Sequence, residues 1–95
     1  MLDSQPVFES RLKATGVGEA HIQELIDAGI TSLGTLAFLT NCQPGIGDDK
    51  PLIDEIAKIL KFNQSNPMPL AVASSIRRIW FEAHSVAMAE MKNKS

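Results

Sequence analysis

The chain is poor in the residues that build disulfides, metal centres and base-stacking surfaces. Its 95 residues include one cysteine, one tryptophan, four phenylalanines and no tyrosine. A single cysteine, Cys42, excludes an internal disulfide and a zinc site made of several thiolates, and it favours a reducing, intracellular compartment. With so few aromatic side chains the core must be aliphatic, and little aromatic surface is left for stacking nucleic-acid bases.

Long apolar runs are also missing. No stretch approaches the roughly 20 apolar residues of a membrane-spanning helix, and the first residues lack the basic-then-apolar pattern of a signal peptide. We therefore expect no membrane association and an intracellular location. A hydrophobic content of 44% is ordinary for a globular protein and suffices for one domain.

Charge is divided unevenly although the net charge is only −2. Residues 1–49 carry two basic and seven acidic side chains, a net charge of −5, whereas residues 50–95 carry seven basic and four acidic ones, a net charge of +3. This asymmetry fits head-to-tail contacts, a modest basic face, or solvated charges with no partner.

Apolar spacing predicts an all-α domain over residues 1–92, with about five helices and no strands. The expected core spans residues 4–62, a linker rich in Asn, Ser and Pro spans 63–69, and residues 93–95 form a frayed tail. Ser4 and Thr31 or Ser32 are expected N-caps, and Asp48 or Asp49 caps the fourth helix. The expected helices begin after Ser4, run over about 19–28, occupy a short stretch after Ser32, and run over about 51–60 and 69–91.

The long fifth helix carries two apolar stripes. A broad stripe faces the expected core and comprises Val72, Ile76, Ile79, Trp80, Ala83, Val86 and Ala87. A second, here named the outer stripe, comprises Leu70, Phe81 and Met88, with Arg77 and His84 beside it. The outer stripe is either exposed on a monomer or covered by a second copy or another protein, and it is the candidate partner interface.

Two short glycine segments punctuate the first half of the chain, Gly16-Val17-Gly18 and Gly45-Ile46-Gly47. Glycine tolerates positive φ, so each segment can reverse the chain between packed helices, with Val17 or Ile46 plugging the core beneath the turn. We expect Gly18 and Gly47 to need positive φ or close helix contacts.

With these segments between helices, residues 12–60 resemble the helix-hairpin-helix family and its relatives with SAM-like five-helix folds. The resemblance implies that two hairpins pack as a pseudo-twofold pair and that their backbone N–H groups hold a nucleic-acid phosphate. The carried-over positions are the two glycine segments, with Lys13 and Lys50 beside them. A fainter resemblance links residues 29–33, 43–45 and 77–84 to segments of mobile-element or virus-like polyproteins, which implies an accessory domain of a larger nucleic-acid-handling system.

The chain departs from the hairpin pattern in its charges. Glu19 opens the second helix and Asp48-Asp49 precede the fourth, where carboxylates repel a phosphate and serve well as caps. Phosphate affinity also needs several cations, and few converge here. Nucleic-acid binding is therefore expected to be weak at best.

Other chemistries find no support in the sequence. The segment from Gly45 to Lys50 lacks the spacing of a phosphate-binding P-loop. His84 and Ser85 are neighbours on one helix and point apart, so they form no nucleophile–base pair. We expect no enzyme activity, no cofactor and no metal. The predicted function is a non-catalytic interaction module, a protein-binding or oligomerising adaptor within a larger assembly or chain, and the alternative is a nucleic-acid-binding accessory domain.

Overall fold

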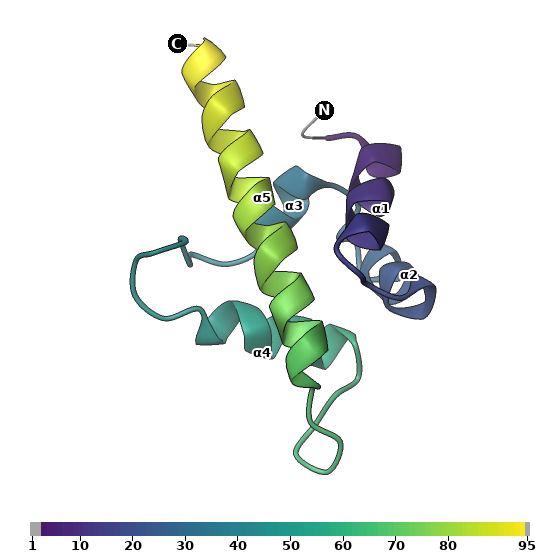
Figure 1. Cartoon of the computed structure of the whole chain (residues 1–95). Coiled ribbons are helices and arrows are strands. Elements are labelled where there is room, and N and C mark those ends of the chain that lie inside the picture. Colours follow the sequence, from purple (N-terminus) through teal and green to yellow (C-terminus); the bar gives the residue numbers. More distant parts are fainter. Residues whose placement is uncertain (1–2, 95) are drawn as a thin grey trace.

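Five helices make up the regular structure of residues 3–94, the part of the chain that the computed structural model describes (Figure 1). They are α1 (Gln5–Ala14), α2 (Glu19–Asp27), α3 (Leu33–Ala37), α4 (Lys50–Ile59) and α5 (Leu70–Lys94). The described residues contain no strand, and a single bridge joins Gln43 to Ile46. The predicted all-α fold is confirmed.

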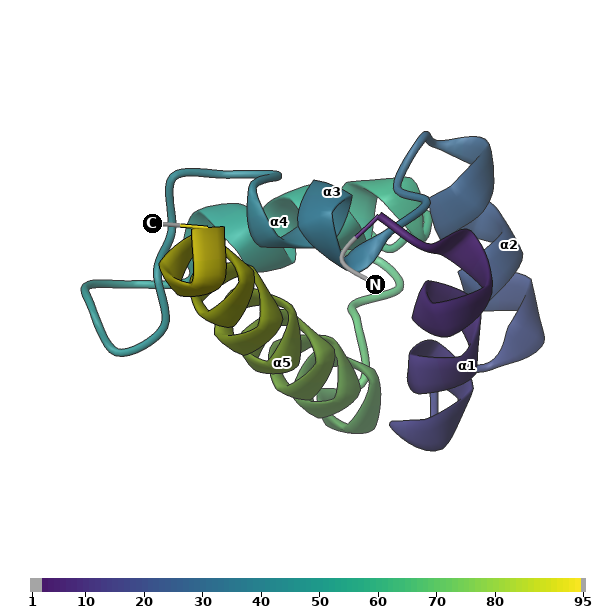
Figure 2. The ribbon, with the colours of Figure 1, turned by 90° about the horizontal axis from the view of Figure 1, so that it is seen from above.

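Helix α5 is the longest helix, and one of its faces packs against the core. Figures 1 and 2 show α3 and α4 on one side of it and α1 and α2 further along, while the remaining side of α5 carries no other helix. α3 packs directly on α5, and α1 packs on α2. The largest fully buried side chains come from all five helices, and they are Phe8, Leu12, Leu25, Leu33, Leu36, Leu52, Ile56, Ile76 and Ile79. The core is aliphatic apart from Phe8 and the almost fully buried Trp80, as the composition predicts.

Three helices end in the same hydrogen-bonded turn, the Schellman motif. One residue just past the helix adopts positive φ, and the apolar residue after it donates its backbone N–H to a carbonyl five residues back. The positive-φ residues are Gly16, Gly29 and Lys61, with φ of 93°, 93° and 66°. The donor–acceptor pairs are Val17 to Leu12 at 3.0 Å, Ile30 to Leu25 at 2.9 Å, and Phe62 to Ala57 at 2.8 Å. Each turn therefore closes a helix and returns an apolar side chain to the core.

Helix starts follow the predicted caps. Ser4 accepts a hydrogen bond from the backbone N–H of Val7 at 3.3 Å, and Ser32 accepts one from Thr35 at 3.1 Å. At α4 the carboxylate of Asp48 accepts a hydrogen bond from the backbone N–H of Lys50 at 3.0 Å. Asp49 occupies the N-cap position of α4 but its side chain makes no capping bond there.

The end of α5 differs from the prediction. The helix continues to Lys94 instead of stopping at Met91, so residues 93–94 of the expected frayed tail are helical, and Ser95 lies outside the described residues. Its last turns contain neither glycine nor proline, and lysine in a final turn interacts favourably with the helix dipole. Figure 1 shows this end of α5 reaching beyond the other helices.

Polar contacts hold α5 against its neighbours. They join Arg11 to Glu82 (Nη2 to Oε2, 3.0 Å), Ser75 Oγ to the carbonyl of Thr15 (2.9 Å), and Arg77 Nε to Asp49 Oδ2 (2.7 Å). These contacts reach α1, the turn after α1, and the start of α4. The orientation of α5 on the domain is therefore fixed by side chains as well as by the core.

Candidate interaction surface

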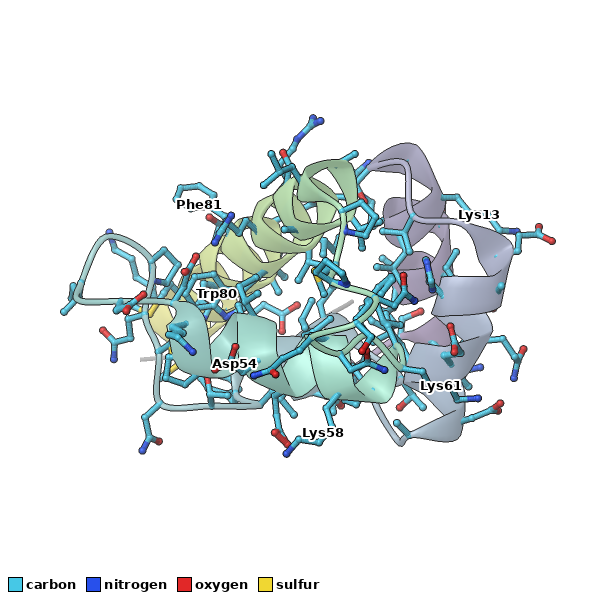
Figure 3. All side chains as sticks on the ribbon, turned by 90° about the horizontal axis from the view of Figure 1, so that it is seen from below. Lys13, Asp54, Lys58, Lys61, Trp80 and Phe81 are labelled. Atoms are coloured by element: carbon cyan, nitrogen blue, oxygen red, sulfur yellow. The ribbon has the colours of Figure 1, made fainter. Side chains whose placement is uncertain are left out.

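Large apolar side chains remain exposed along the free side of α5. Phe81 is 61% exposed and Met88 64%, whereas Trp80, the residue before Phe81, is only 4% exposed. Figure 3 shows Trp80 directed toward α4 and Phe81 directed away from the other helices. The division of α5 into a buried stripe and an exposed outer stripe is confirmed for these residues.

The C-terminal half of α5 forms one wall of an apolar groove of about 550 Å³. The loop between α3 and α4 forms the other wall, because Phe38 faces Phe81, His84, Met88 and Met91 across it. Phe38 is 62% exposed and Met91 58%. The groove is therefore built from two segments, residues 38–44 and 81–91, that lie far apart in the sequence.

His84 lines this groove and lies between two aromatic rings. Its ring centroid lies 5.1 Å from that of Trp80 and 6.0 Å from that of Phe38, both in edge-to-face arrangements. Its Nε2 atom is buried, and no hydrogen-bond partner for it occurs among the described residues. The imidazole of His84 thus lies at the border between the buried face of α5 and the exposed groove.

Arg77 has a partner within its own chain. Its guanidinium donates to both carboxylate oxygens of Asp49, at 2.7 and 3.5 Å. The hydrogen bond to Asp49 raises the pKa of Arg77 above its ordinary value. Arg77 also lines a shallow pocket beside Phe81, together with Ser74 and Arg78. Its position is therefore fixed beside the outer stripe, with half of its side chain accessible.

Leu70 lies at the first residue of α5 and is 86% exposed. It does not line the groove, which begins near Phe81. The structure thus brings Phe81, His84 and Met88 together and leaves Leu70 more than two turns away along the helix.

The first glycine segment, residues 16–18, is the turn between α1 and α2. Val17 is buried, as expected, but the glycine that adopts positive φ in this turn is Gly16. Gly18 has φ of −69°, and a Cβ added to it would meet nothing within 4 Å. The expectation that Gly18 needs positive φ or close contacts is therefore wrong. Lys13 beside this turn pairs with Glu19 at 3.5 Å.

The second glycine segment, residues 45–47, has a different structure. It lies in the exposed loop before α4, where the N–H of Ile46 donates to the carbonyl of Gln43. Ile46 is 68% exposed, so the expectation that it plugs the core is wrong. The turn lies within the exposed loop between α3 and α4, eight residues past the end of α3, so no core lies beneath it. Lys50, the nearby cation, pairs with Asp54 at 2.8 Å.

Sequence reasoning missed Phe38 and Met91 as parts of the groove. Met91 carries a sequence signal, since it continues the outer stripe at Phe81, His84 and Met88 with helical spacing. Phe38 carries none, because its proximity to α5 depends on how α3 packs against α5. No helix within the described residues has the length and apolar character needed to cross a bilayer.

Comparisons with protein-family models, with curated proteins and with solved structures find no match to this chain. The resemblance to helix-hairpin-helix and SAM-like proteins therefore stays a prediction from two short glycine segments.

Proposed function

We propose that this chain is a non-catalytic protein-interaction module that binds through the groove and outer stripe of α5. One observation carries the proposal. Four large apolar side chains (Phe38, Phe81, Met88 and Met91) stand exposed around a single groove in a domain whose other large apolar residues mostly form one core. A contiguous patch of this kind is typical of a binding site, unlike apolar residues scattered singly over a surface.

The composition of the groove favours a protein as the ligand. Its lining residues are of the types Phe, His, Met, Pro, Gln and Ser, with no lysine, arginine, aspartate or glutamate among them. Protein interfaces are enriched in aromatic residues and methionine and lose charged residues at their centre. Methionine also adapts its shape to a partner because its side chain is unbranched and flexible.

The surroundings of the groove suit a partner helix. α5 presents a straight ridge of exposed side chains, and a helix of 25 residues is about 37 Å long. An amphipathic partner helix that lies along this ridge can bury its own apolar face, because its apolar residues also recur every three or four positions. We therefore place this module inside a larger assembly or a longer chain, with α5 as its docking element.

Photo-crosslinking in cells of the source organism tests the proposal. A benzophenone amino acid is introduced at Phe81 or at Met88, with Ala20 on the exposed surface of α2 as the matched control position. We expect discrete protein adducts from positions 81 and 88 and none from position 20. No protein adduct from either α5 position, or equal adducts from all three, would contradict the proposed function.

Weak nucleic-acid binding at the first glycine segment is the second candidate. The supporting observation is that α2 starts directly after the turn with no side chain capping it, which leaves backbone N–H groups to attract an anion. Lys13 is paired with Glu19 there, so little positive charge is available. We expect labelled single- and double-stranded DNA and RNA to bind weakly, with an affinity that fades as salt rises. Micromolar binding at about 150 mM salt would reverse the order of the two candidates.

A further inference from the structure

Seven positions on the outer side of α5, six of them exposed and His84 half-buried, are spaced alternately by four and three residues. In chain order they are Leu70, Ser74, Arg77, Phe81, His84, Met88 and Met91, here named the outer seam. The exposed residues Ala71, Arg78 and Ser85 lie along one flank of this series. Alternation of three and four is the heptad spacing with which two helices pack along each other. The seam thus extends over three heptads, well beyond the groove.

We propose that the occupant of the outer seam is the α5 of a second copy, lying antiparallel. This inference rests on the proposed function and names its partner. The groove alone would accept any apolar segment, whereas the seam has the length, spacing and distribution of charge that suit its own reverse copy.

Charge decides the direction of the pair. In a parallel pair, each seam residue meets its own counterpart, so Arg77 would face Arg77 and the neighbouring Arg78 would approach Arg78. Like charges facing each other across a helix pair are destabilising. An antiparallel pair separates these arginines along the axis and brings them opposite neutral positions.

One antiparallel register matches all the central positions. With the twofold axis between residues 82 and 83, Phe81 packs on His84 of the second copy. Arg77 then lies over Met88 of the second copy and Ser74 over its Met91, while Arg78 comes near Ser85. Phe81 and His84 of both copies form one aromatic cluster, flanked by each copy's Phe38, which already contacts His84. Leu70 falls outside the overlap in this register.

The area available fits a dimer that depends on concentration. A large side chain has roughly 200 Å² of surface, and Phe38, Phe81, Met88 and Met91 are each about 60% exposed. Two copies therefore bring roughly 1,000 Å² of apolar surface from these residues alone, near the lower limit for specific interfaces. We expect a dissociation constant on the order of tens of micromolar.

Solution mass across protein concentration tests the pairing. The wild type is expected to change from monomer to dimer between about 5 µM and about 1 mM. Phe81→Asp places a carboxylate in the aromatic cluster and is expected to weaken the dimer more than about tenfold. Leu70→Asp makes the same chemical change on the same seam outside the overlap and is expected to leave the dimer unchanged. A wild type that stays monomeric at about 1 mM, or equal losses in both variants, would overturn the inference.

Disulfide trapping tests the direction on a Cys42→Ser background. Chains with Ser74→Cys and chains with Met91→Cys are expected to cross-link when mixed, and neither is expected to cross-link alone, because the matching positions lie opposite each other only in the antiparallel pair. Cross-linking of Met91→Cys with itself would show a parallel pair and overturn the inference. Such failures leave the proposed function standing if positions 81 and 88 still give protein adducts, so the two proposals can fail separately.

Discussion

The two faces of α5 are both apolar, yet they have opposite fates. Ile76, Ile79 and Ala83 on the inner face are fully buried, whereas Phe81 and Met88 on the outer face are mostly exposed. A domain of this size has enough helices to cover one face of its longest helix. The inner face therefore belongs to the core, and the outer face stays accessible to solvent.

The largest expected effect separates the two faces by stability. Ile79→Ala removes a fully buried side chain and should lower the free energy of unfolding by about 2–5 kcal/mol. Phe81→Ala, measured on dilute protein, should change it by less than about 0.5 kcal/mol. Urea unfolding followed by circular dichroism measures both. Similar losses in the two variants would mean that Phe81 belongs to the core of its own domain.

The turn beneath the inner face gives the next largest effect. Gly16 has φ of 93°, and a Cβ there would point at the Ser75 hydroxyl of α5, 3.7 Å away. Gly16→Ala should cost about 1–2 kcal/mol because an L-residue is strained in this conformation. Gly18→Ala is the matched control, with ordinary φ and open space, and should stay within about 0.5 kcal/mol. Thermal melts of the two variants measure this difference. A larger drop in melting temperature for Gly18→Ala than for Gly16→Ala would contradict the assignment of Gly16 as the residue that needs positive φ.

A substitution in the turn after α4 is expected to raise the stability of the domain. Lys61 has φ of 66°, the left-handed conformation that glycine adopts without strain. Lys61→Gly should therefore stabilise the domain by roughly 0.5–1 kcal/mol, although glycine loses more entropy on folding. The exposed ion pair of Lys61 with Glu24, at 3.9 Å, contributes little in comparison. A lower melting temperature for Lys61→Gly would contradict this explanation of the turn. The proposed pairing of α5 with a second copy should be unchanged in this variant.

The smallest expected effect lies at the border between the faces. Arg77→Gln removes the guanidinium from Asp49 and should cost less than about 1 kcal/mol, because the pair is solvent-exposed. A double-mutant cycle with Asp49→Asn measures the coupling between the two side chains. A coupling above about 2 kcal/mol would mean that Arg77 acts mainly as a structural clamp.

Local patterns predicted most of the architecture. The helices and the two stripes of α5 follow from apolar periodicity, and Ser4 and Ser32 cap as their residue types suggest. Such features depend on neighbours within a few residues. The positive φ of Lys61 was not predictable in this way, because no glycine marks that turn.

The two glycine segments show where local patterns fail. They have similar sequences, but Val17 is buried after α1 and Ile46 is exposed in a loop. Only tertiary structure decides which turn has a core beneath it. The same holds for the groove, since the approach of Phe38 to α5 and the pairing of Arg77 with Asp49 are long-range contacts without a sequence signal.

The pairing of the outer face of α5 with a second copy of the chain can be observed directly at its methionine methyl groups. In protein labelled at these methyls, nuclear magnetic resonance spectra are recorded from about 10 µM to about 1 mM. We expect the signals of Met88 and Met91 to shift progressively with concentration. Met68, half-buried before α5 and away from the groove, is expected to stay in place as an internal control. Fixed signals at Met88 and Met91, or an equal shift at Met68, would contradict the pairing of α5 with a second copy.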